Sequence, residues 1–138
     1  MKFICLGYFD EGQWEKKSKS EQDALMEECF AYDDVLRKGG HWLDGGAALQ
    51  GASTARTLRW KSGKVSVTDG PYAETKEVIG GLGVLEAKDM SEAVELMSKH
   101  PGVRIGPFEI RPVEEAIHEL MEERRRRLEK QSKPSPSS

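Results

Sequence analysis

The sequence predicts a soluble α+β domain built on a mostly antiparallel sheet. Strand-like and helix-like stretches follow one another in the order β-α-β-(β-hairpin)-β-α-β. Two helices are too few to serve as crossovers for so many parallel strands, so they should cover one face of an antiparallel sheet. A ferredoxin-like split βαβ arrangement with an inserted β-hairpin is the simplest match to this order. At 138 residues the chain is long enough for one hydrophobic core.

The first half of the chain supplies a strand, a helix and a second strand. Residues 2–9 are predominantly apolar and are expected to form the first strand. Ser20 is the expected N-cap of the first helix. The apolar face of this helix recurs at steps of four, three and four: Leu25, Cys29, Tyr32 and Leu36. Gly39 and Gly40 end the helix, and the second strand is expected over residues 41–49.

The second half begins with a hairpin, because residues 54–60 and 64–68 are strand-like and flank a short turn with a glycine. Residues 78–87 predict another strand. Ser91 is the expected cap of a second helix, and residues 103–113 predict the last strand of the core.

Glycine and proline mark irregular places in these two later strands. Gly80, Gly81 and Gly83 indicate a β-bulge or the close approach of a backbone or ligand. Tight packing of a helix on the sheet accounts for the same glycines equally well. Pro107 favours an edge position or a bulge for the last strand.

The first strand is apolar on both of its faces. One face carries Phe3, Cys5 and Phe9, and the other carries Ile4, Leu6 and Tyr8. Two helices can cover only one face of the sheet, and the other would leave a large apolar patch in a monomer. We therefore expect a homodimer that packs sheet to sheet.

The chain changes character after this domain, which spans residues 1–113. Residues 114–131 predict an appended, charged amphipathic helix, and residues 132–138 predict a disordered tail. The four arginines of residues 124–127 invite a nucleic-acid interpretation. A solvated helix end is the stronger interpretation, because glutamates precede the run and the net charge is −3.

Localisation follows from the cysteines and from the lack of long apolar segments. Cys5 and Cys29 fall inside apolar patterns and are expected to be buried free thiols. No stretch approaches the roughly 20 apolar residues of a membrane helix, and no cleavage site follows the N-terminal strand. A cytoplasmic protein is expected.

The most informative segment is Asp69 to Glu77, which reads DGPYAETKE. An aspartate in a turn commonly bonds the N–H two residues on, but here that residue is Pro71, which has none. Its carboxylate must find another donor: the N–H of Tyr72, a side chain, water or a ligand. A solvated surface turn is the alternative interpretation of this segment.

This segment resembles the signature of the YCII-related family, in the branch called the DGPF domain, with Tyr72 in place of phenylalanine. The resemblance extends over residues 1–113 and includes the closing stretch from Glu109 to Val113. It implies a dimeric α/β barrel and a functional link to sigma factors of the extracytoplasmic-function type.

Relatives in the YCII branch supply one chemical precedent. A His–Asp pair is proposed there as an acid–base dyad, and a few members act on chlorinated aromatic hydroxyquinones. The histidine of that dyad lies in the first helix, whereas Ser20 to Lys38 contains none in this chain. The dyad is therefore not carried over to this sequence.

Two function classes remain open, a homodimeric small-molecule-binding or regulatory module and a small-molecule enzyme that uses acid–base chemistry. The catalytic candidates are Asp69 and His41. The ligand-binding candidates are Asp69, Gly70, Pro71, Tyr72, Glu74, Lys76 and Glu77. His100 precedes Pro101 at a helix end, where a cation suits the helix dipole. No cofactor or metal is expected, because no metal-ligand spacing or nucleotide-binding loop occurs.

Overall fold

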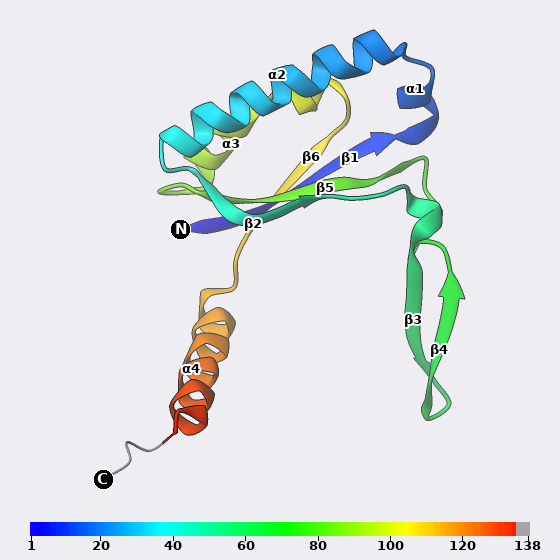
Figure 1. The fold of residues 1–138 in the computed structure, drawn as a ribbon. Helices are drawn as coiled ribbons and strands as arrows, with labels where there is room; N and C mark the ends of the chain where they lie inside the picture. The colour runs from blue at the N-terminus through cyan, green and yellow to red at the C-terminus, as the bar shows by residue number, and fades with distance from the viewer. Residues whose placement is uncertain (135–138) are drawn as a thin grey trace.

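The computed structural model describes residues 1–134 and contains a four-stranded sheet and a separate two-stranded hairpin (Figure 1). The sheet consists of β1 (Lys2–Asp10), β2 (Trp42–Ala48), β5 (Glu77–Glu86) and β6 (Phe108–Pro112) in the order β2-β5-β1-β6. Every pairing in it is antiparallel, which confirms the predicted α+β class. The end of the predicted tail, residues 135–138, lies outside the described residues.

The helices α2 (Lys19–Lys38) and α3 (Met90–Ser98) lie on one face of the sheet (Figure 1). A short helix, α1 (Glu11–Glu15), and two 3₁₀ turns, η1 (Ala52–Thr54) and η2 (Pro101–Arg104), join the larger elements. Among residues 1–134, no helix is both long and apolar enough to cross a membrane.

Both long helices of the domain begin earlier than the sequence predicts. Ser18, and not Ser20, is the N-cap of α2, and its hydroxyl accepts the Glu21 N–H at 3.2 Å. Asp89, and not Ser91, caps α3 by accepting the Glu92 N–H at 2.8 Å. In each case the earlier residue has extended backbone geometry, which an N-cap requires.

The hydrophobic core lies between the sheet and its two helices. Its central side chains are fully or nearly fully buried: Phe3, Cys5, Leu36, Leu85, Ala87, Ala93 and Met97. The odd-numbered residues of β1 therefore face the helices, as the alternation of a strand requires.

The opposite face of the sheet is apolar but has no helix over it. Ile4 pairs with Val84 and Leu6 pairs with Leu82 across β1 and β5, and all four side chains are only partly buried. The two-faced first strand of the prediction is confirmed. The hairpin β3 (Arg56–Lys61) and β4 (Lys64–Asp69) projects from this side.

The last strand is shorter than the predicted range of residues 103–113. The turn η2 occupies its first part, because the His100 ring caps that turn and Pro101 stands at its start. β6 is an edge strand, and Pro107 precedes it directly. The Pro107 carbonyl accepts the Tyr8 N–H at 2.9 Å, so the edge position expected for this proline is confirmed.

The glycines of β5 make room for a bulge and for aromatic rings. The register between β1 and β5 passes from Gly7–Gly81 to Tyr8–Ile79, which leaves Gly80 as the extra residue of a bulge. A Cβ atom at Gly83 would clash with the Trp42 ring. The close neighbour of Gly83 is thus an aromatic ring of the adjacent strand β2, an arrangement known to stabilise glycines in sheets.

Replacing Gly83 by alanine is therefore expected to destabilise the domain by about 1–3 kcal/mol, because the Trp42 indole must shift in a packed interior. Urea unfolding followed by circular dichroism measures this change. The matched control is Gly12→Ala, where the nearest atom lies 3.4 Å from the added Cβ atom. Equal stability of the two variants would contradict the close ring contact.

Candidate functional site

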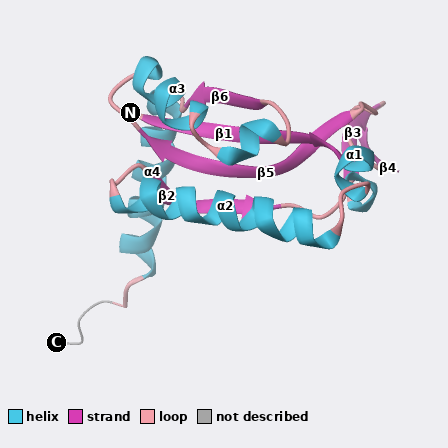
Figure 2. Ribbon diagram, turned by 90° about the horizontal axis from the view of Figure 1, so that it is seen from above, coloured by secondary structure: helices cyan, strands magenta, loops and turns pink. Residues whose placement is uncertain are grey.

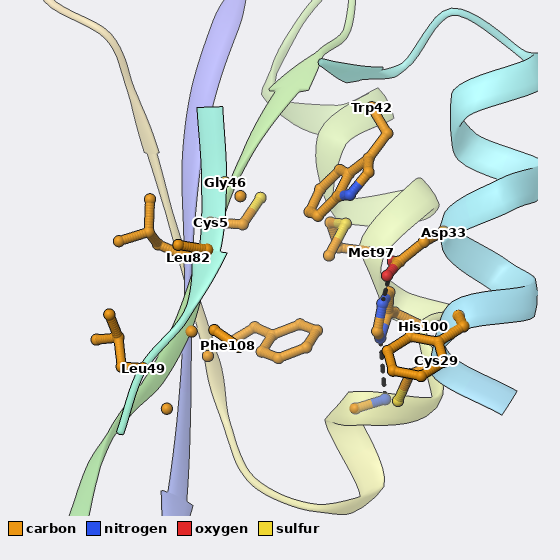
Figure 3. A pocket seen from close by; sticks show the side chains of 18 of the residues that line it. Cys5, Cys29, Asp33, Trp42, Gly46, Leu49, Leu82, Met97, His100 and Phe108 are labelled. Carbon is orange, nitrogen blue, oxygen red and sulfur yellow. Dashed lines mark hydrogen bonds and ion pairs between the residues drawn. The ribbon is translucent and has the colours of Figure 1, made fainter. Parts of the chain in front are cut away.

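A cavity of about 590 Å³ lies beside the sheet, with α2 and the η2 region along its walls (Figure 3). Backbone of glycine residues forms much of the lining contributed by the sheet: Gly7, Gly45, Gly46, Gly80, Gly81 and Gly83. α2 contributes Met26, Cys29, Phe30, Asp33 and Arg37. Trp42 and Phe108 point from the sheet toward the helices, whereas Leu49 and Leu82 point away from them.

A buried histidine joins the two helices at one wall of this cavity. His100 is only 8% exposed, and its Nε2 lies 2.8 Å from Oδ1 of Asp33 on α2. Its Nδ1 accepts the backbone N–H of Gly102 at 2.9 Å. Because Nδ1 is an acceptor here, Nε2 carries the hydrogen and donates a hydrogen bond to the Asp33 carboxylate.

This arrangement decides which of the two groups can meet a ligand. Both ring nitrogens of His100 are engaged, so the ring has no free lone pair for general base catalysis. The Asp33 side chain is 25% exposed, and within residues 1–134 its Oδ2 makes no hydrogen bond. His100 therefore holds Asp33 in place, and the Asp33 carboxylate is a polar group that can face a ligand in the cavity.

Aromatic rings fix the orientation of the histidine. Tyr32 and Phe108 approach the His100 ring edge-on, with centroid distances of 5.6 and 5.3 Å. The Tyr32 hydroxyl donates to the Leu96 carbonyl at 2.6 Å, which ties α2 to α3 beside the pair. Packing and hydrogen bonds thus leave the Asp33–His100 pair little rotational freedom.

Both thiols of the chain line the same cavity and are buried and free, as the sequence predicts. Burial raises the pKa of the Cys5 thiol to about 11. Burial also raises the pKa of Cys29, and the nearby Asp33 and Glu28 carboxylates add to this effect. Because the thiolate is the reactive form, both cysteines line the cavity as apolar groups and do not act as nucleophiles at neutral pH.

Asp69 is the last residue of β4 and lies at the base of the projecting hairpin. Its carboxylate finds a side chain, Arg56, with the Arg56 Nε 3.1 Å from Oδ1. These two residues are cross-strand partners at the base of the hairpin, and the Asp69 side chain is 87% exposed. Gly70 follows with a φ of +96°, and its N–H donates to the Ala55 carbonyl at 2.8 Å. The pair closes the base of the hairpin.

The remaining candidates of the segment lie along the chain between the hairpin and β5. The Arg59 guanidinium lies over the Tyr72 ring at 5.6 Å and donates to the Tyr72 carbonyl at 3.2 Å. Lys76 Nζ lies 3.9 Å from Asp10 Oδ2, Glu74 is exposed, and Glu77 begins β5.

A second cavity of about 770 Å³ occupies the junction between this segment and the sheet. The segment lines it with Pro71, Tyr72, Ala73, Thr75 and Glu77. Tyr8 and Ile79 border it from β1 and β5. Neither Asp69 nor Lys76 is among its lining residues.

The structure does not bring His41 and Asp69 together. His41 stands between α2 and β2, and its Nδ1 lies 2.8 Å from the Glu86 carbonyl oxygen. Asp69 lies at the hairpin, beyond the far end of β2 (Figure 1). Within the described residues, no group of three or more His, Cys, Asp or Glu side chains could hold a metal ion.

Sequence reasoning missed the Asp33–His100 pair, because 67 residues separate the two positions. One local signal was present in His100-Pro101-Gly102. Proline has no N–H, so the first N–H that the His100 ring can accept is that of Gly102. Asp33 carried no comparable signal, since aspartate on a helix surface is ordinarily solvated.

Comparisons with known proteins identify the family. The model of the YCII-related domain matches residues 1–117, and the chain belongs to this family. An uncharacterised protein of Rhizobium meliloti (strain 1021) is 32% identical over 117 residues, which cover 82% of this chain and 92% of that protein.

Among solved structures, the chain resembles a 5-chloro-2-hydroxyhydroquinone dehydrochlorinase from Burkholderia phenoliruptrix AC1100, in complex with 2,5-dihydroxybenzoquinone. The TM-score is 0.51 at 14% sequence identity, and the match covers 83% of this chain and 94% of that chain. At this identity the likeness concerns the fold.

The raised thiol pKa predicts a loss of stability at alkaline pH. The Cys5 pKa rises from 9.0 to about 11 in the folded state, so the folded protein holds this proton more tightly than the unfolded chain. The stabilisation is complete below pH 9 and is lost as the pH rises toward 11. Cys5→Ala should therefore show a flatter decline of unfolding free energy over this range. Parallel declines in urea titrations would contradict a buried, protonated thiol.

Proposed function

We propose that this protein is a homodimeric small-molecule-binding protein whose ligand occupies the cavity beside α2. The proposed ligand is a flat, largely apolar ring that carries a hydroxyl group. The observation that carries the proposal is the Asp33 carboxylate, which His100 holds at the wall of a cavity rich in apolar and backbone groups.

The dimensions and lining of the cavity support this ligand class. A volume of about 590 Å³ falls in the range of roughly 300–1,000 Å³ that is typical of small-molecule sites. Aromatic rings cover the glycine backbone, with Trp42 against Gly83 and Phe108 against Gly7, and Phe30 lines the cavity from α2. Asp33 Oδ2 can accept a hydrogen bond from a ligand hydroxyl.

Acid–base chemistry at Asp33 is the second candidate function. The free Oδ2 of a carboxylate can take a proton from a bound hydroxyl group, with His100 as the positioning residue through Oδ1. The related fold of a dehydrochlorinase that was solved with a dihydroxybenzoquinone supports a quinone-like ring as the first probe. In this proposal Asp33 replaces the pair of Asp69 and His41 expected from the sequence.

The finer architecture is part of the same proposal. The order β2-β5-β1-β6 with two helical crossovers supports a ferredoxin-like arrangement. The helix-free apolar face supports sheet-to-sheet pairing into a dimeric α/β barrel. The DGPY segment at Asp69 supports membership of the DGPF branch.

The ligand proposal is tested by thermal shift with 2,5-dihydroxybenzoquinone and a panel of hydroxylated aromatic rings. We expect the wild type to be stabilised and Asp33→Asn to lose about tenfold in affinity, because a hydrogen bond to a charged group is replaced. Asparagine keeps an oxygen for the His100 proton, so the variant should fold normally.

Tyr72→Ala is the matched control, because Tyr72 lines the second cavity and not the first. Loss of response in Tyr72→Ala alone would move the site to the Asp69–Glu77 segment. Absence of any response in the wild type would contradict the proposal. Consumption of the ligand by the wild type, abolished in Asp33→Asn, would favour the enzyme over the binding module.

Leu82→Lys is expected to turn the dimer into a monomer, because Leu82 lies on the helix-free face and a buried ammonium group there would be unpaired (Figure 3). Light scattering at micromolar concentration measures the mass. Val35→Lys, at a 61% exposed position of α2, is the control and should remain dimeric. A monomeric wild type would contradict the proposed sheet-to-sheet dimer.

A further inference from the structure

The projecting hairpin carries one largely apolar face, with the Arg56–Asp69 pair at its base. Leu58 pairs with Val67 and Trp60 pairs with Val65, so four apolar side chains share one side of the two strands. Their exposed fractions run from 54% to 72%. The other side of the hairpin is polar, with Thr57 opposite Thr68 and Arg59 opposite Ser66. A lone two-stranded hairpin is at best marginally stable in water, so this face is suited to a partner.

The C-terminal helix α4 (Glu115–Ser132) presents a matching surface. Its apolar stripe recurs at helical spacing and is 50% to 63% exposed: Ile117, Leu120, Met121 and Leu128. The helix buries none of its residues. Because most helical stability in proteins comes from packing an apolar face, this stripe also calls for a partner.

These two elements stand at opposite ends of the sheet. Figure 1 shows α4 and the β3–β4 hairpin projecting on the side away from α2 and α3, and Figure 2 shows the same separation from above. Two copies packed through their helix-free faces can be related by a two-fold axis that runs across the strands. Such an axis exchanges the ends of the sheet and brings α4 of one copy beside the hairpin of the other.

Their charges are complementary as well. The hairpin has a basic excess, with Arg56, Arg59, Lys61 and Lys64 against Asp69 alone. The first half of α4 is acidic, with Glu115, Glu119, Glu122 and Glu123. Within the helix Arg125 pairs with Glu122 at 2.6 Å, which leaves Glu115, Glu119 and Glu123 as the acidic groups of this half that can meet the hairpin. Opposite charges across an interface favour this pairing and fix its register.

We propose that a second copy of this chain is the partner, and that α4 of each copy packs on the apolar face of the other copy's hairpin. The clasp, as we call this reciprocal contact, joins the stripe around Met121 to the cluster around Trp60. It rests on the proposed sheet-to-sheet dimer and adds two interfaces to it. The segment around Asp69 then serves as the joint that holds each hairpin in position.

A double-mutant cycle on the full chain tests the clasp. Trp60→Glu and Met121→Lys each place an unpaired charge in the contact, so each should raise the dimer dissociation constant tenfold or more in sedimentation experiments. The double variant places the two charges together across the interface and should recover a measurable part of this loss. Val94→Lys on α3, 48% exposed on the helix-covered side, is the control and should leave the dissociation constant unchanged.

The outcomes separate this inference from the dimer itself. A monomeric wild type would overturn both proposals. A dimer whose dissociation constant is unaffected by either single substitution would overturn the clasp alone and leave these surfaces to a different partner. Weakening by both single variants without recovery in the double variant would show that the two surfaces do not meet. Circular dichroism of each variant confirms that it is folded.

Discussion

The antiparallel pairing of β1 with the glycine-rich strand β5 is the constraint on which the other features depend. Without side chains at Gly80 and Gly83, the sheet accepts a bulge beside Tyr8 and the Trp42 ring against its surface. The Phe9 ring packs at Gly80 and the Trp42 ring at Gly83, and both aromatic residues line the cavity beside α2. The glycines therefore weaken the strand locally, and in return they accommodate the bulge and the aromatic rings beside the cavity.

The Asp33–His100 pair shows how the helical layer completes this space. His100 lies just past the end of α3 and bonds Asp33 on α2, so it links the two helices together with the Tyr32–Leu96 hydrogen bond. Because both ring nitrogens of His100 are engaged, the ring orients the Asp33 carboxylate and has no free nitrogen for a ligand. The Asp33 carboxylate is thus held in place by a side chain that packs against the core.

The sequence predicted features that local patterns encode, and missed those that depend on contacts between distant residues. The order of elements, the hairpin, the two-faced β1 and the buried thiols follow from periodicity and turn residues, and these expectations were confirmed. The predicted extent of β6 was wrong because a 3₁₀ turn capped by His100 occupies the first part of the predicted range. Asp69 drew attention through Pro71, yet the donor it found, Arg56, was fixed by hairpin register. Asp33 remained hidden because only the fold brings His100 to it.

The exposed apolar face of the hairpin also affects the tendency of a single copy of the chain to aggregate. Trp60 and its neighbours sit on two short strands whose outer edges have no neighbouring strand in the described fold. Unpaired edges beside exposed β-branched and aromatic residues are sites where chains aggregate. In the proposed clasp, α4 of the second copy would cover this face, so a copy that has not yet dimerised is the species most exposed to aggregation. The charged residues Lys61 and Lys64 at the hairpin tip counteract such stacking until then.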